Sequence, residues 1–187
     1  MDRRQQKSRK AILDAFTNLL TKKEYVKITV QEIIDEADVG RTTFYAHFET
    51  KDALLEEMCT NLFSHVFSDH PVVESSHDFS LSEGDFKTVV CHILYHLKEN
   101  GSTISRLLTG ESSETFLRYF SQYLNKLIQN YVLSHMEKKN SSIPEDFLQN
   151  HIAGSFITMV QWWIKRGMKE SPEELTEYFL AVTVPVI

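Results

Sequence analysis

The sequence is poor in residues that make turns, with six glycines and four prolines among its 187 residues. Together these make up about 5% of the chain, against roughly 12% in average proteins. β-Sandwiches and β-barrels use such residues at most strand connections, so their scarcity indicates a mostly helical chain. Cysteine is scarcer still: Cys59 and Cys91 form no CxxC motif and are too few for a disulfide framework.

Long apolar runs are missing as well. No stretch reaches the roughly 18 consecutive apolar residues that a membrane-spanning helix needs. The first ten residues, MDRRQQKSRK, are basic, but the apolar core of a secretory signal does not follow them. The sequence therefore predicts a cytoplasmic protein that has reduced cysteines and no membrane partner.

Motifs of hydrolytic and nucleotide-dependent enzymes are also absent. The sequence contains none of the patterns GxSxG, GxxxxGK(S/T), GxGxxG and HExxH. Cys59 lies on the apolar face of a predicted helix, where a thiol is usually buried and inert. We therefore expect no enzymatic activity, no catalytic residues and no cofactor.

The net charge of −6 is unusual for a nucleic-acid-binding protein, but it is unevenly distributed. Residues 1–60 carry a net charge of −1 and residues 61–187 one of −5, so an N-terminal module can still present a positive face. Five basic side chains lie within residues 1–10 and fit two interpretations, a solvated chain end or an arm that reaches DNA. They are Arg3, Arg4, Lys7, Arg9 and Lys10.

The N-terminal third has the pattern of a helix-turn-helix. Helical spacing of apolar residues predicts a helix over residues 4–22, and the capping box TVQE opens a second helix over residues 30–37. The residues DVG then make the turn into a third helix, RTTFYAHF at residues 41–48. A helix that enters a major groove about 12 Å wide needs a slim, polar outer face and a braced inner one. Phe44 and Phe48, spaced i, i+4, can supply that brace.

Residues 29–54, TVQEIIDEADVGRTTFYAHFETKDAL, closely resemble the TetR (tetracycline repressor) family of bacterial transcriptional regulators. The resemblance covers about residues 8–56 and includes the Thr-capped helix, the aromatic T-x-Y-x-H-F helix and the K-x-x-L that follows. Two positions depart from the family pattern, with Asp38 where Gly is common and Gly40 where Ser or Thr usually caps the helix. Asp tolerates a left-handed backbone and Gly is an acceptable cap, so only a hydroxyl contact from residue 40 to phosphate is in question.

The resemblance implies both an architecture and a function. The fold is expected to be all-α, with a helix-turn-helix DNA-binding head over residues 1–50 and a helical effector-binding and dimerisation body over residues 51–187. The protein is expected to be a homodimeric repressor that binds a palindromic operator in double-stranded DNA and is released by a small-molecule effector. Base edges are expected to be read by Arg41, Thr42 and Thr43, and phosphates to be contacted by Thr29, Tyr45, His47 and Lys51. Arg is the commonest bidentate reader of guanine, which agrees with the first assignment.

Periodicity predicts further helices after the head. They are expected from residue 51 to about 68, from about 85 to 99, from about 113 to 138, from 145 to 166 and from 173 to 184, with a polar connector over residues 68–84 and a polar loop over 137–142. Aromatic residues are dense in these helices, which favours core packing at most positions and a ligand cavity at some. The expected cavity for an apolar or aromatic ligand is lined by Phe63, His92, Tyr95, Phe120, Tyr123 and Trp163.

The last two predicted helices carry more apolar surface than one small body readily covers. Pairing with a second copy in a four-helix interface is therefore expected. Trp162 and Trp163 differ by about 100° on a helix, so one should face the core and the other a partner or solvent. The expected interface residues are Phe156, Met159, Val160, Leu175, Tyr178, Phe179 and Val182.

Eight histidines raise the alternative of a metal-responsive regulator. His92 and His96 share a helix face at i, i+4, a spacing that can chelate a transition metal, while His65, His70 and His77 flank the connector. No Cys or carboxylate motif completes either set, so no metal site is predicted. A second alternative, a helical ligand-binding protein without DNA activity, is disfavoured by the polar outer face at residues 41–47.

Overall fold

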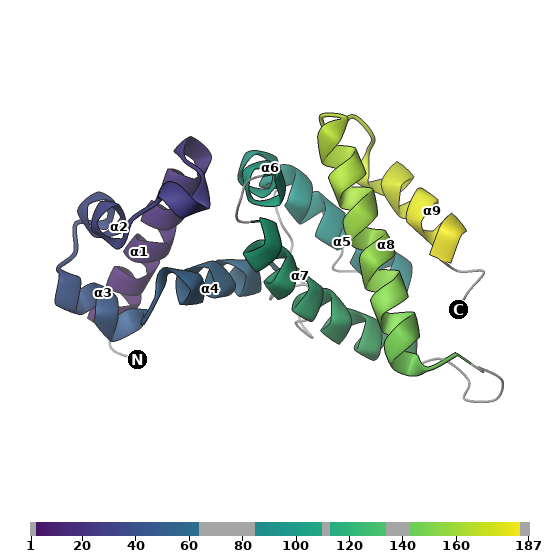
Figure 1. Ribbon diagram of the computed structural model, residues 1–187, viewed down its shortest axis with the longest axis horizontal. Coiled ribbons are helices and arrows are strands. Elements are labelled where there is room, and N and C mark those ends of the chain that lie inside the picture. Colours follow the sequence, from purple (N-terminus) through teal and green to yellow (C-terminus); the bar gives the residue numbers. More distant parts are fainter. Residues whose placement is uncertain (1–2, 64–84, 110–112, 134–142, 184–187) are drawn as a thin grey trace. The chain divides into compact units, whose positions relative to one another are not determined.

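The computed structural model describes residues 3–63, 85–109, 113–133 and 143–183 (Figure 1). Every regular element within these ranges is a helix, which confirms the all-α class, and none is long and apolar enough to cross a membrane. The predicted connector at 68–84 and loop at 137–142 lie outside the described residues. The elements are α1 (Arg3–Lys22), the 3₁₀-helix η1 (Tyr25–Lys27), α2 (Val30–Ala37), α3 (Arg41–His47), α4 (Lys51–Phe63), α5 (Phe86–Glu99), α6 (Gly101–Thr109), α7 (Ser113–Ile128), the π-helical segment η3 (Gln129–Leu133), α8 (Glu145–Lys165) and α9 (Pro172–Thr183).

The chain divides into two compact units. The first comprises residues 1–61 and 102–119, and the second comprises residues 62–101 and 120–187. The division predicted from the sequence falls before α4, whereas α4 belongs to the first unit as far as Asn61. The helix-turn-helix is thus part of a larger unit that includes most of α4.

Helices α1, α2 and α3 pack together at the start of the chain (Figure 1). Each contributes its apolar stripe to a common interior: Ile12 and Phe16 of α1, Ile33 of α2 and Phe44 of α3 have no exposed surface. Full burial of such a side chain stabilises the folded state by about 1.5–3 kcal/mol. Burial therefore fixes the three helices to one another, and α2 and α3, with 8 and 7 residues, are too short to be stable alone.

Helix ends coincide with the local signals in the sequence. Thr29 and Glu32 form the predicted capping box at the start of α2. Ser171 and Glu174 make the equivalent pair at the start of α9, with the Ser171 N–H donating to the carboxylate at 2.8 Å and the Glu174 N–H to the Ser171 hydroxyl at 3.1 Å. Gly167, with a φ of 74°, follows the end of α8 in the left-handed conformation that glycine allows.

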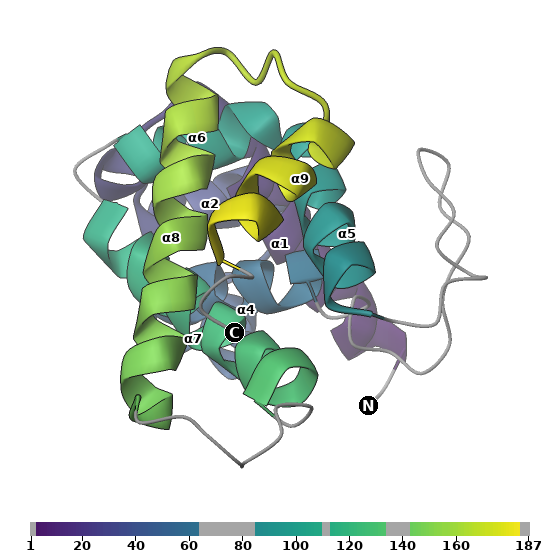
Figure 2. The same ribbon diagram turned by 90° about the vertical axis from the view of Figure 1, so that its right-hand side faces the viewer.

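In the second unit, α9 packs against both α5 and α8 (Figure 2). Trp163 of α8 is completely buried and its indole N–H donates to the carbonyl oxygen of Glu170 at 3.1 Å. Its neighbour Trp162 is 42% exposed. The prediction that one indole faces the core and the other does not is confirmed.

Candidate nucleic-acid interface

The turn between α2 and α3 sets the direction of α3. Asp38 has φ 50° and ψ 49°, in the left-handed region, and the N–H of Val39 donates to the carbonyl oxygen of Ile34 at 3.2 Å. Gly40 precedes α3 with extended backbone, and its carbonyl accepts the N–H of Phe44 at 3.0 Å. Because Asp is among the few non-glycine residues that tolerate this conformation, its presence at residue 38 leaves the turn intact.

Helix α3 has one buried face and one polar face. Phe44 and Phe48 belong to the buried face and are at most 3% exposed, as their spacing predicts. The outward-facing side chains are those predicted to contact DNA: Arg41, Thr42 and Tyr45 are exposed, and Thr43 and His47 are half-buried. Hydrogen-bonding groups therefore lie on a helix whose other side is fixed to the core.

Arg41, the first residue of α3, contacts α2. Nη2 of Arg41 donates to Oε1 of Gln31 at 3.3 Å, and Nε2 of Gln31 donates to Oδ1 of Asp35 at 2.8 Å. Gln31 and Asp35 are one turn apart on α2, where side chains at i, i+4 meet. The guanidinium is therefore held between the two helices while Arg41 stays exposed.

The start of α1 lies beside α3. A hollow of about 350 Å³ is lined by both helices, and within its lining the Ser8 hydroxyl oxygen lies 2.8 Å from Nε2 of His47. The basic segment at the start of the chain is helical from Arg3 onward, because it forms the first turns of α1. Arginine, hydroxyl and imidazole groups together suit a phosphate. The lining residues are Arg4, Gln5, Ser8, Arg9, Thr42, Thr43, Ala46 and His47.

Arg9 is engaged within the protein. Its Nε donates to Oε1 of Glu57 at 2.8 Å, and its guanidinium carbon lies 4.7 Å from the centre of the Phe48 ring. This ion pair joins α1 to α4 across 48 positions of sequence. Sequence reasoning missed Glu57, because nothing local to either residue indicates so distant a partner.

Lys51 holds the link between α1 and α2. Its ammonium donates to the carbonyl oxygens of Tyr25 and Ile28, each at 2.8 Å, and lies 4.2 Å from the centre of the Tyr25 ring. Burial lowers the pKa of Lys51. The next residue, Asp52, accepts a hydrogen bond from the Tyr25 hydroxyl. The first turn of α4 is therefore fixed to η1, and one of the three ammonium protons remains for a phosphate.

Replacing Lys51 with Met should destabilise the first unit as well as weaken DNA binding. Two buried carbonyls lose a charged donor, which should cost about 1–3 kcal/mol of unfolding free energy. Loss of the phosphate contact that the sequence predicts for Lys51 should reduce the slope of log affinity for DNA against log salt concentration by about one unit. Urea unfolding and salt-dependent binding measure the two effects separately. Lys22→Met, at an exposed lysine whose ammonium lies 3.6 Å from the Glu36 carboxylate, is the control and should change stability by less than about 1 kcal/mol. An unchanged unfolding free energy in Lys51→Met would contradict the structural role.

Thr29 is held at the start of α2 by its capping box. Its hydroxyl accepts the Glu32 N–H at 3.2 Å, and the Glu32 carboxylate accepts the Thr29 N–H at 2.9 Å. Lys23 forms an ion pair with the same carboxylate. Hydrogen bonds from Lys23 and then Thr29 lower the pKa of Glu32 to about 2, so the box is intact at neutral pH.

Two of the residues predicted to line a ligand cavity are core residues. Phe120 and Trp163 are completely buried. Tyr95 donates its hydroxyl proton to Glu173, and this bond raises the pKa of Tyr95 to about 12. Burial also raises the pKa of Tyr123. These aromatic groups are therefore packed or paired within the protomer.

A small cavity lies among α5, α7, α8 and α9. Its volume is about 10 Å³, which leaves room for one water molecule at most. Phe156 and Phe179 are in its lining, whereas none of the predicted ligand residues with a described side chain is: His92, Tyr95, Phe120, Tyr123 and Trp163. The side chain of Phe63 lies outside the described part of the chain.

The histidines do not complete a metal site where the structure describes them. Within those ranges, no group of three or more His, Cys, Asp or Glu is placed to hold an ion. The rings of His92 and His96 are 4.8 Å apart, and His96 is buried. His65, His70 and His77 lie outside the described residues.

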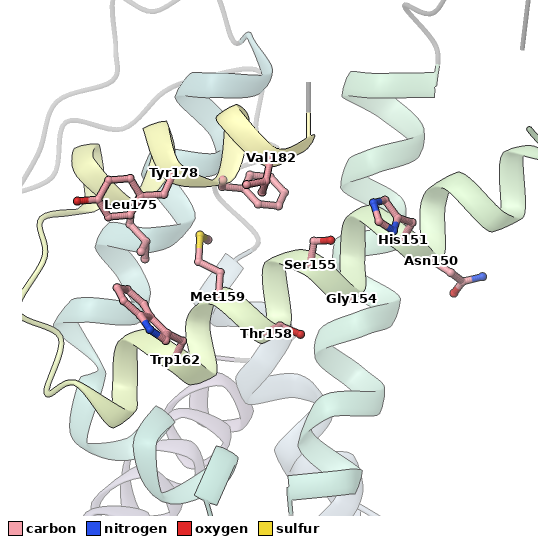
Figure 3. Close-up of a pocket in the computed structure, with 11 residues that line it drawn as sticks. Asn150, His151, Gly154, Ser155, Thr158, Met159, Trp162, Leu175, Tyr178 and Val182 are labelled. Atoms are coloured by element: carbon pink, nitrogen blue, oxygen red, sulfur yellow. The ribbon is translucent and has the colours of Figure 1, made fainter. Parts of the chain in front are cut away.

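A groove of about 680 Å³ runs along the seam between α8 and α9 (Figure 3). Trp162, Tyr178 and Val182 line it with 42%, 50% and 66% of their surface exposed. Single exposed apolar residues are ordinary, but several beside one groove are typical of a surface that binds a protein or a small-molecule ligand. The groove is also lined by Asn150, His151, Gly154, Ser155, Thr158, Met159, Leu175 and Phe179.

The structure separates the predicted dimer residues into three groups. Met159, Tyr178 and Val182 line the groove and reach the surface. Leu175 and Phe179 line it from within the core, being at most 2% exposed, and Phe156 and Val160 are core residues that do not line it. Periodicity located the apolar helices correctly, but it does not separate the face that meets the protomer's own core from the face that remains open.

Several groove residues were not anticipated. Small and polar side chains at His151, Ser155 and Thr158 continue the stripe that ends at Trp162. Their spacings of four, three and four residues place them on one helical face, so the spacing alone could have indicated them. Sequence reasoning missed them, because small and polar side chains do not stand out in an apolar periodicity.

Two family models match the chain. One, described as "Bacterial regulatory proteins, tetR family", matches residues 12–58, which include α2, the turn, α3 and Lys51. The other, described as "Transcriptional regulator C-terminal region", matches residues 84–183, which include the groove between α8 and α9.

Individual proteins show the same similarity. The uncharacterized HTH-type transcriptional regulator YxbF of Bacillus subtilis (strain 168) is 31% identical over 186 residues, covering 96% of this chain; the chain spans 45% of that relative's length. A crystal structure of a TetR transcriptional regulator from Streptococcus agalactiae 2603V is 36% identical, with a TM-score of 0.72 and coverage of 97% of this chain and 96% of that one. The dihydroxyacetone kinase operon activator DhaS, at 21% identity, a TM-score of 0.66 and 96% coverage of each chain, shares the fold.

Proposed function

Because the chain belongs to the tetR family of bacterial regulatory proteins, whose members are transcriptional regulators, we propose that it binds double-stranded operator DNA with α3 in the major groove. The observation that carries the proposal is the division of α3 into two faces. Phe44 is buried, while Arg41, Thr42 and Tyr45 are exposed. A recognition helix needs this arrangement, because its exposed side chains read base edges while its buried face fixes the helix to the core.

Two roles are proposed for the residues around α3. Arg41, Thr42 and Thr43, at the N-terminal end of the helix, read base edges, where Arg forms bidentate contacts with guanine. Phosphates are held by Thr29, Tyr45, His47 and Lys51, which surround α3. Phosphate contacts fix the register on DNA, whereas base contacts select the sequence.

The regulator is proposed to act as a homodimer joined through α8 and α9. Support comes from the exposed Trp162, Tyr178 and Val182 beside one groove. A twofold axis through this seam would bring four helices together, and C2 pairing is the commonest way in which a protein covers such a surface. Two recognition helices would then read palindromic half-sites about 34–36 Å apart or a multiple of that distance.

Repression with release by a small-molecule effector completes the proposed function. The ammonium of Lys51, in the first turn of α4, donates to the carbonyl oxygens of Tyr25 in η1 and of Ile28, which follows η1. A displacement of that turn would therefore pull on the link between α1 and α2. An effector lowers operator affinity only if it binds the DNA-free conformation better than the DNA-bound one.

Arg41→Ala tests the proposal, with an operator located by footprinting on the DNA that flanks the gene. Operator affinity should fall by about 1–3 kcal/mol per reading contact, with relaxed preference at one base pair in each half-site. Affinity for scrambled DNA should change much less. Both affinities are measured at several salt concentrations. Lys126→Ala, which removes a cation from α7, is the control and should leave operator preference unchanged. Equal losses on operator and scrambled DNA in Arg41→Ala would make Arg41 a phosphate contact instead.

A further inference from the structure

We infer that Gln31 of α2 is a positioning residue for sequence recognition, because its side-chain amide sets the orientation of the Arg41 guanidinium. The inference rests on the proposed function, in which Arg41 reads a base. The structural basis is the chain of two hydrogen bonds from Arg41 to Gln31, at 3.3 Å, and from Gln31 to Asp35, at 2.8 Å. Both partners come from α2, so the first helix of the motif sets the geometry of the second.

The contact leaves the guanidinium able to read a base. Arg has five N–H donors in a planar fork, and Gln31 accepts one proton of Nη2. The second proton of Nη2 and both protons of Nη1 stay available. A bidentate contact with guanine uses one proton from each of two nitrogens, directed to O6 and N7. Gln31 therefore fixes the plane of the fork without occupying the fork itself.

Asp35 determines which end of the Gln31 amide faces Arg41. An ionised carboxylate only accepts hydrogen bonds, so it selects the NH₂ group of the amide. Nε2 of Gln31 accordingly points to Asp35, and the carbonyl oxygen, Oε1, is left for the guanidinium. Without Asp35, either end of the amide could face Arg41, and the NH₂ end would repel it.

Pre-orientation favours the specific complex over the non-specific one. A long arginine side chain loses much rotamer freedom when it is fixed on one base. A side chain that is already partly ordered loses less of this freedom on binding, which strengthens the complex. Non-specific binding needs no fixed orientation of Arg41, so Gln31 should contribute to discrimination and not to general affinity.

Gln31→Met tests the inference, because methionine keeps the length and helix propensity of glutamine but removes the amide. The readout is discrimination, defined as the ratio of affinities for the operator and for an operator altered at the base pair that Arg41 reads. Discrimination should fall roughly threefold to tenfold, as expected when two contacting residues are coupled. The thermal unfolding midpoint and the affinity for scrambled DNA should not change. Gln129→Met, the same substitution at an exposed glutamine in η3, is the control and should retain full discrimination.

The same substitution in an Arg41→Ala background completes the test. Gln31→Met should then have no further effect, since it has no guanidinium to position. If Gln31→Met lowers discrimination equally with and without Arg41, Gln31 contacts DNA itself and the inference is wrong. If Gln31→Met leaves discrimination unchanged while Arg41→Ala reduces it, the inference is also wrong, but the proposed function stands. If Arg41→Ala itself leaves discrimination unchanged, base reading by Arg41 fails and the inference fails with it.

Discussion

A protein carrying Tyr178→Asp and Val182→Asp should sediment as a monomer at micromolar concentration and bind its operator at least about a hundredfold more weakly than the wild type. Both side chains are half or more exposed beside the groove of α8 and α9. In the proposed dimer, both subunits would carry each new carboxylate, and association would bury it opposite an apolar surface. An unpaired charge in that position costs several kcal/mol, and separate heads lose the gain in affinity from binding two half-sites together.

The folded protomer should survive these two substitutions, because neither side chain belongs to its core. Ala181→Asp together with Gln129→Asp adds the same charge at exposed positions outside the groove lining and is the matched control. This control should remain dimeric and keep normal operator affinity. Sedimentation velocity and operator titration on the same samples measure both properties. A dimer that persists in the groove variant would place the interface elsewhere on the chain.

Phe44→Ala should unfold most of the N-terminal unit and abolish binding to operator and scrambled DNA alike. Phe44 has no exposed surface, and its ring packs against the rings of Tyr45 and Phe48 at centroid distances of 5.3 and 6.1 Å. Removing a buried Phe ring costs about 3–5 kcal/mol. Because a whole domain is stable by only about 5–15 kcal/mol, little of the unit's stability would remain.

The exposed Phe147 of α8 provides the matched control for Phe44. It is 63% exposed, so Phe147→Ala should change the unfolding free energy by no more than about 0.5 kcal/mol. Differential scanning calorimetry should show an early transition for Phe44→Ala alone, and sedimentation should still show a dimer. If both variants unfold like the wild type, α3 is not held by the core, and the physical basis for its rigidity is lost.

Features that depend on near neighbours in the sequence were predictable. The pair Thr29 and Glu32, three residues apart, contains the whole capping box, and Ser171 with Glu174 contains another. Helical geometry alone required Trp162 and Trp163 to face different ways. In each case the interacting groups are placed by the local backbone, so residue type and spacing suffice.

Features that depend on distant partners were not predictable. Lys51 donates to two backbone carbonyls more than 20 residues away. Every residue has a backbone carbonyl, so the residue types in the sequence do not reveal which ones accept a hydrogen bond. The Arg41–Gln31 contact exists only because the turn at Asp38 folds α3 back on α2. Periodicity shows that a helix face is apolar, but whether the face meets the core or a partner depends on how the helices pack.

Two residues belong both to the lining of the α8–α9 groove and to the core, so the folding equilibrium and the proposed dimerisation equilibrium are coupled. Leu175 and Phe179 line the groove, yet both are buried in the folded protomer. In the proposed dimer the interface would therefore rest on side chains of the folded core, and unfolding of one subunit would also remove the surface through which it associates. By mass action, whatever binds only the folded protomer also protects it from unfolding, so dilution would lower the melting temperature of this regulator. The concentration of the protein in the cell would then affect its folded fraction as well as the occupancy of its operator.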